Sequence, residues 1–209
     1  MNSRAELLIH DLLEKIPRNP NYKSIPIRRS GPSMIVWHCD DAPNWDVWDV
    51  VGYDLRPNHL SPKGCPVPTY SYWIARSGRI YKIAQEAYVT WHAGVSRIDR
   101  IRYHIPDWNE VAIAICFAHD PDTEPDLTPE QYESGHLLSA WIAVRRDIQS
   151  NSIRGHRELA VTGYDPKTGR LRKTCPGLGI DLDAVRRSVR DLKLKLLSGE
   201  LHLEVRVVQ

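Results

Sequence analysis

Residues 111–118, VAIAICFA, are apolar without interruption. The run has the length of a strand rather than of a helix, and an apolar strand without alternation is typical of the buried interior of a sheet. A second short stretch, MIVWH at residues 34–38, is β-branched and aromatic and predicts another buried strand. Segments with helical spacing intermix with these strands. The sequence therefore predicts an α/β domain built on one sheet.

Local signals place the other elements. Residues 128–131, Thr-Pro-Glu-Gln, begin a helix with a capping threonine, a proline in the first turn and a glutamine placed for a capping box, and helical spacing continues to about residue 148. Two strand-like arms in residues 70–83 surround Ser77-Gly78 and predict a hairpin. Further helices are predicted over residues 45–53 and 182–197, and a short strand over residues 152–154.

The two ends of the chain carry different patterns. Residues 2–15 interleave charged residues with leucines and predict an amphipathic helix. Residues 199–209 end in LHLEVRVVQ, where apolar and polar residues alternate as in a strand, and predict an added edge strand or an oligomer contact. We therefore divide the chain into an N-terminal helical extension (1–32), a main domain (33–198) and a C-terminal tail (199–209).

Charge and hydropathy exclude several classes of partner. The formal net charge of +2 is too small to indicate a polyanionic partner, so no nucleic-acid binding is expected. No run approaches the roughly 18 apolar residues of a membrane helix, so no membrane insertion is expected. The charged first stretch differs from a signal peptide, which predicts a protein that is cytoplasmic as synthesised, with reduced cysteines. The oligomeric state is not predicted.

A few histidines and one cysteine stand in contexts where chemistry is common. His38 ends a predicted strand, His92 lies in TWHAG, and His156 lies in RGHRE at the end of another strand. Cys175, in RKTCPG, follows His156 by 19 residues. Two histidines and one cysteine satisfy the three-ligand count of a catalytic zinc site. Spacing alone leaves Cys175 open as a buried apolar thiol, half of a disulfide, a nucleophile or a metal ligand.

Five ordered motifs resemble one family. IVWHCDDA, TYSYWIARSGRIY, TWHAG, RGHRE and KTCPG follow one another as in the zinc-dependent N-acetylmuramoyl-L-alanine amidases of the amidase-2 type, over about residues 33–190. That family includes the phage T7 lysozyme type of endolysin and the peptidoglycan recognition proteins. The resemblance implies a central mixed β-sheet flanked by helices, with residues 33–198 as the catalytic domain. It also implies one Zn²⁺ per chain, held by His38, His156 and Cys175.

The resemblance implies roles for three more residues. Tyr70 and Lys173 match catalytic helpers, and an oxyanion that develops during amide hydrolysis needs a hydrogen-bond donor and a positive charge of this kind. His92 matches a histidine that borders the zinc and substrate groove, so we expect it to contact the substrate rather than the metal. Some members carry a glutamate on the central strand, but VAIAICFA contains no carboxylate.

The remaining cysteines receive structural interpretations. Cys39 follows His38 directly, and neighbouring residues of a strand point to opposite faces, so Cys39 is expected to be a buried thiol rather than a rival ligand. Cys116 lies within the apolar run and is expected in the core. Cys65, in a proline-rich loop, receives no role.

The implied function is zinc-dependent hydrolysis of the amide between N-acetylmuramic acid and L-alanine in peptidoglycan. A phage or prophage endolysin would do this after release to the cell wall. Two alternatives stay open: a recognition module that binds peptidoglycan without cleaving it, and a cytoplasmic amidase that recycles anhydro-muropeptides. The presence of Cys175 is evidence against the recognition module, in which this cysteine is typically replaced.

Overall fold

The computed structural model describes residues 3–93, 100–101, 104, 106–124, 126–159 and 174–209. Its centre is one sheet with the strand order β6-β2-β5-β3-β4-β1-β7. The strands are β1 (Ser3–Asp11), β2 (Met34–Cys39), β3 (Tyr72–Ile74), β4 (Ile80–Lys82), β5 (Ala112–Phe117), β6 (Ile153–Gly155) and β7 (Leu201–Val208). The helices are α1 (Val47–Leu55), α3 (Trp108–Val111), α4 (Pro129–Arg145) and α5 (Leu182–Ser198), with short 3₁₀ segments η1 (Ser150–Ser152) and η2 (His156–Glu158).

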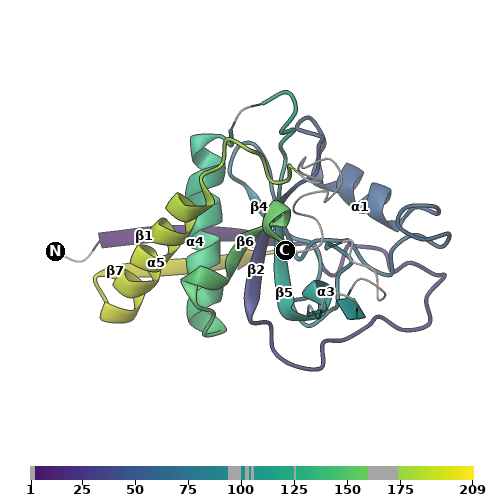
Figure 1. Cartoon of the computed structure of the whole chain (residues 1–209), viewed down its shortest axis with the longest axis horizontal. Helices are drawn as coiled ribbons and strands as arrows, with labels where there is room; N and C mark the ends of the chain where they lie inside the picture. The colour runs from purple at the N-terminus through teal and green to yellow at the C-terminus, as the bar shows by residue number, and fades with distance from the viewer. Residues whose placement is uncertain (1–2, 94–99, 102–103, 105, 125, 160–173) are drawn as a thin grey trace.

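The sheet is mixed and covered on both faces. Only β3 and β4 pair antiparallel among the strands described. Helices α4 and α5 lie side by side over one face, as Figure 1 shows. Phe117 of β5 packs in that core, whereas Cys116 packs with Val50 and Val51 of α1 in a second core. Because neighbouring residues of a strand face opposite ways, α1 covers the other face. The predicted mixed sheet flanked by helices is confirmed.

Helix and hairpin predictions based on short motifs are confirmed. Thr128 caps α4, and the side chain of Gln131 accepts from the Thr128 amide to complete the capping box. The antiparallel β3–β4 pair forms the predicted hairpin, with Gly78 at a φ of 77°. The predicted buried strand at residues 111–118 is β5, and every residue of β5 is buried. In the described part of the chain, no helix combines the length and apolar character needed to cross a bilayer.

The helix predicted over residues 2–15 is wrong, because residues 3–11 form strand β1 instead. β1 lies between β4 and β7 and pairs in parallel with both. The spacing of its apolar residues is compatible with the period of a helix and with that of a strand. The strand buries Leu7 and Ile9, whereas Leu8 between them is 39% exposed. Residue-by-residue pairing with β7, from Ser3↔Leu201 onward, outweighs the helical propensity of the segment. The strand predicted in the C-terminal tail is confirmed as β7, at the edge of the sheet.

The packing of α4 on β2 and β5 yields a stability prediction. Gly135 of α4 faces the buried rings of Trp37 and Phe117, and a Cβ built on it would lie 2.8 Å from Phe117 Cζ. Alanine is about 1 kcal/mol better than glycine inside a helix, but overpacking a core costs about 1–3 kcal/mol. We expect Gly135→Ala to lower the free energy of unfolding by about 1 kcal/mol in urea denaturation.

Gly52 of α1 is the matched control for this substitution. A Cβ built on Gly52 meets no atom within 4 Å, and the residue is exposed. Gly52→Ala should therefore raise the free energy of unfolding by up to about 1 kcal/mol through helix propensity alone. An equal rise in the free energy of unfolding for Gly135→Ala and Gly52→Ala would contradict the close packing of Gly135.

Candidate metal centre and pocket

Three side chains from distant parts of the sequence meet at one point. His38 lies near the end of β2, His156 begins η2 directly after β6, and Cys175 comes from the segment before α5. One ligand atom from each lies within 4.8 Å of the others. β2 and β6 are neighbouring parallel strands, so their carboxyl ends meet at one edge and the two imidazole centroids are 4.6 Å apart. The predicted ligands are thus brought together as a group that could bind a metal ion.

The environment of Cys175 favours the thiolate. The backbone N–H of Cys39 donates to Cys175 Sγ at 3.2 Å, and His38 Nδ1 is 3.8 Å from the same sulfur. Burial by itself raises the pKa of the Cys175 thiol, but hydrogen bonds from Cys39, His156 and His38 lower it well below its ordinary value. The thiolate is the form of cysteine that binds metals.

Close backbone packing holds the segment that carries Cys175. The Arg157 N–H donates to the Cys175 carbonyl at 2.8 Å. Gly155 makes this approach possible, because a Cβ there would lie 2.9 Å from Pro176 Cδ and 2.6 Å from a methyl of Leu182. The Glu158 carboxylate accepts from the Gly155 N–H at 2.9 Å and secures the turn at which His156 begins. The turn and the cysteine segment therefore stabilise each other.

His92 lies against His38. His92 Nδ1 is 3.0 Å from His38 Nε2, whereas the Cys175 sulfur lies near the other ring nitrogen of His38, Nδ1. Burial, together with the nearby His38 and His156, holds the pKa of His92 well below its ordinary value, so His92 is neutral at neutral pH. A neutral His92 can accept a hydrogen bond from His38 Nε2, and His38 Nδ1, the nitrogen beside the Cys175 sulfur, would then be the one that binds a metal. His92 also lines the pocket described next.

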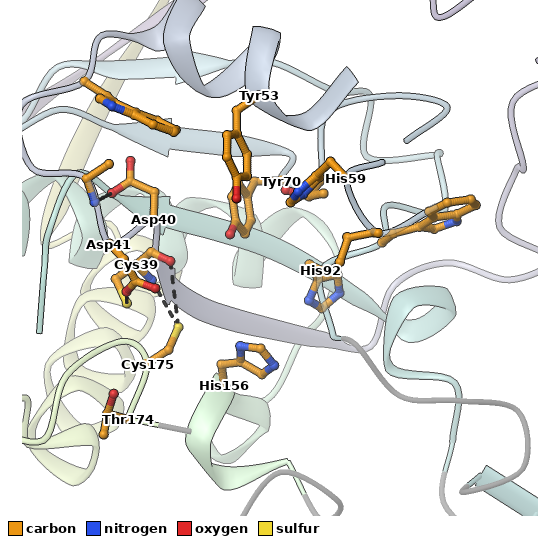
Figure 2. A pocket seen from close by; sticks show the side chains of 15 residues that line it. Cys39, Asp40, Asp41, Tyr53, His59, Tyr70, His92, His156, Thr174 and Cys175 are labelled. Carbon is orange, nitrogen blue, oxygen red and sulfur yellow. Dashed lines mark hydrogen bonds between the residues drawn. The ribbon is translucent and has the colours of Figure 1, made fainter. Parts of the chain in front are cut away.

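A pocket of about 620 Å³ opens beside the three candidate ligands. Figure 2 shows His92, His156, Cys175 and Tyr70 around its space. The ring of Tyr70 is 5.3 Å from that of His38, and burial raises the pKa of the Tyr70 phenol well above its ordinary value. Tyr70 is therefore a neutral hydrogen-bond donor. Lys173, the other predicted helper, lies outside the described residues.

The pocket also contains side chains for which the sequence predicts no role. Asp40, Asp41, Trp45, Tyr53 and His59 belong to its lining. Burial raises the pKa of Asp40 to about 6, against the effect of a 2.7 Å hydrogen bond from Trp73 Nε1. Of these residues, Asp40 and Asp41 could have been predicted as pocket residues from the sequence. They directly follow a buried strand, and strand ends are where sites are commonly built.

All four cysteines lie within the described residues and are free thiols. Cys39 is buried and outside the ligand group, and its thiol donates to the Asp41 carboxylate at 3.2 Å. Cys116 is buried in the core, as predicted. Cys65 is fully buried away from the pocket, and burial raises the pKa of its thiol to about 12, which makes it an unreactive thiol.

The sequence and the fold match known proteins. The family model described as N-acetylmuramoyl-L-alanine amidase matches residues 28–178. A mutant endolysin from Bacillus subtilis is similar in fold, at 16% identity over 88% of this chain and 99% of that chain, with a TM-score of 0.60. The selenomethionine derivative of AmpD is also similar (22% identity, 90% and 93% covered, TM-score 0.58), as is Drosophila PGRP-LB (18%, 88% and 93%, 0.55).

A comparison with curated proteins finds no match. The structural similarities lie below 25% identity and bear on the fold alone. The family model, however, covers well over half of the chain and includes His38, His92, His156 and Cys175. The chain therefore belongs to the N-acetylmuramoyl-L-alanine amidase family.

Proposed function

We propose that this protein hydrolyses the amide between the lactyl group of N-acetylmuramic acid and L-alanine in bacterial peptidoglycan, with one zinc ion held by His38, His156 and Cys175. The observation that carries the proposal is the convergence of two imidazoles and a thiolate beside a pocket large enough for part of a muropeptide. Family membership supports the substrate class and the bond that is cleaved.

The donor set fits zinc. Zinc prefers nitrogen and sulfur ligands, and catalytic sites use three protein ligands so that one position stays available. The Cys39 amide, which donates to Cys175 Sγ, and His92, which contacts His38, are outer partners of the kind that orient metal ligands. Zinc bound in such a site supplies a Lewis acid and lowers the pKa of a bound water.

The chain's own side chains would then act on the substrate. Negative charge develops on the carbonyl oxygen as the amide is attacked, and preorganised donors stabilise that charge. Tyr70, a neutral phenol next to His38, is placed to donate such a hydrogen bond. Lys173 would add a positive charge, a role that rests on its position two residues before Cys175.

The proposed setting is cell lysis, in which the substrate is the polymeric wall. A recycling amidase is the alternative, and its substrate would be soluble anhydro-muropeptides. Both substrates can be offered to the purified protein, with released L-alanine amino termini measured by mass spectrometry. Faster cleavage of anhydro-muropeptides than of intact wall would assign the recycling role. Binding of the wall without release of amino termini would assign the recognition module.

Metal removal and loss of Cys175 should have the same effect. We expect a chelator to abolish release of L-alanine amino termini from cell walls, and added Zn²⁺ to restore it. Because losing an outer partner of a metal ligand already costs about 10–100-fold in affinity, Cys175→Ala should lower zinc affinity by at least about 100-fold. Zinc content by elemental analysis and activity on walls are the measurements.

Cys65→Ala is the matched control, because Cys65 is a buried thiol outside the pocket. It should keep one zinc per chain and normal activity. Unchanged wall cleavage by Cys175→Ala would overturn the proposed site.

Measurements of zinc affinity and of KM distinguish two possible roles of His92, orientation of His38 and contact with the substrate. If it orients His38 through the 3.0 Å contact, His92→Phe should lower zinc affinity by roughly 10–100-fold, as measured by competition with a chelator. Trp91→Phe, at the neighbouring pocket position, should leave zinc affinity unchanged. Unchanged zinc affinity with a raised KM for His92→Phe would instead support the substrate contact predicted from the sequence.

Tyr70→Phe tests the donor to the developing oxyanion. Removing one such donor lowers kcat by roughly 100-fold in other hydrolases, and we expect a fall of that order with zinc content unchanged. Tyr53→Phe is the control, since Tyr53 lines the same pocket and its ring packs against His59 rather than against His38. Equal kcat values for the two variants would exclude Tyr70 from the chemistry.

A further inference from the structure

Strand β7 forms a long, regular edge of the sheet. It pairs with β1 on one side, and no strand of the described residues pairs with its other side. It is eight residues long and contains no proline, glycine or lysine. Edge strands that lack such features are ready to pair with a further strand. Figure 1 shows β1 and β7 extending together beyond the rest of the sheet.

The backbone of β7 presents a defined set of groups at this edge. The Ser3 N–H donates to the Glu200 carbonyl at 2.9 Å, so the backbone of residue 200 turns toward β1. Because backbone groups of successive strand residues point alternately to opposite edges, residues 202, 204 and 206 also turn toward β1. The N–H and C=O groups of Leu203, Val205 and Val207 therefore point to the free edge.

The two faces of β7 differ in chemistry. Leu203 and Val205 pack partly against the core beneath α4 and α5, and Val207 is 57% exposed on the same face. Glu204 and Arg206 lie on the opposite face, where Arg206 forms a 3.1 Å ion pair with Glu6 of β1. Along the free edge, one face of β7 thus carries a row of apolar side chains, and the opposite face carries one negative and one positive side chain.

We propose that β7 pairs with β7 of a second copy of this chain, antiparallel and centred on Val205, so that the two sheets become one. In this register Val205 faces Val205 of the second copy, and Leu203 faces Val207. These are the residues with outward backbone groups, so each exchanges both of its hydrogen bonds across the interface. Apolar side chains meet on the helix-covered face and cover the exposed Val207.

The same register pairs opposite charges. Glu204 stands opposite Arg206 of the second copy, and Arg206 opposite Glu204. These are non-hydrogen-bonded positions, where facing side chains come closest, and such pairs stabilise a sheet while like charges destabilise it. Two-fold registers centred on Glu204 or Arg206 would set like charges opposite each other. A register centred on Leu203 places Val207 opposite Gly199, the left-handed cap of α5, and shortens the paired stretch.

The arrangement leaves both pockets accessible. β7 and β6 lie at opposite edges of the sheet, and the candidate metal ligands belong to the β2–β6 side. A dimer through β7 would therefore carry two separate pockets. Two sites on one particle raise the effective affinity for a repeating polymer without any new contact.

Light scattering after size-exclusion chromatography, over a concentration series of the full chain, tests the proposal. The chain should show twice the mass of one copy. Glu204→Arg sets the new guanidinium opposite Arg206 of the second copy, and this like-charge pair should raise the dimer dissociation constant on the order of tenfold. The double variant Glu204→Arg/Arg206→Glu restores opposite charges across the interface, so it should recover the dimer. A chain that is monomeric throughout the series overturns the proposal.

Val205→Pro provides a second, independent test. Proline at this position removes an outward N–H and none of the hydrogen bonds to β1, so the fold is expected to persist with its circular dichroism and zinc content unchanged. The dimer should be lost in Val205→Pro and kept in the control Val205→Ala, which retains the N–H. A dimer that survives both Val205→Pro and Glu204→Arg would place the interface elsewhere and overturn the proposal.

Discussion

The pairing of β2 with β5 on one side and β6 on the other determines where the candidate ligands lie. On the face under α4, the Trp37 ring packs 4.7 Å from that of Phe117, and its Nε1 donates to Ser139 Oγ at 3.0 Å. His38, the next residue, projects from the opposite face because side chains alternate along a strand. The packing of Trp37 under α4 thus fixes the position of the His38 imidazole on the opposite face of the sheet. A preorganised metal site requires ligands that are held in place in this way.

Elements whose signals are complete within a few consecutive residues could be predicted, whereas β1, whose structure depends on distant partners, could not. The capping box of Thr128 and Gln131 and the turn at Gly78 are complete within their own segments, so the sequence alone indicates α4 and the β3–β4 hairpin. β1 depends on β7, whose residues lie almost the whole chain length away. The apolar residues of the first segment are also compatible with a helical period, and the pairing with β7 and β4 decides between the two structures.

The candidate site shows the same limit. His38 and His156 come together because β2 and β6 are neighbours, with Trp37 in register with Gly155, and no spacing in the sequence states that adjacency. Resemblance to a family supplied the ligand set that the pattern left open. The contact between His92 and His38, and the presence of Tyr53 of α1 and of His59 in the pocket, arise from segments that converge only in the folded chain.

The surroundings of Cys175 distinguish among the roles that its sequence context allows. The structure contains no disulfide, and all four cysteines, which lie within the described residues, are free. A nucleophilic thiolate needs one adjacent base and an open approach, whereas Cys175 has two imidazoles whose ligand atoms and sulfur all lie within 4.8 Å of one another. A backbone N–H on the sulfur and a neutral His92 behind His38 add partners that a metal ligand set uses. The geometry therefore favours the role of a metal ligand. A side chain at Gly155 would prevent the segment that carries Cys175 from packing directly on the turn that begins with His156.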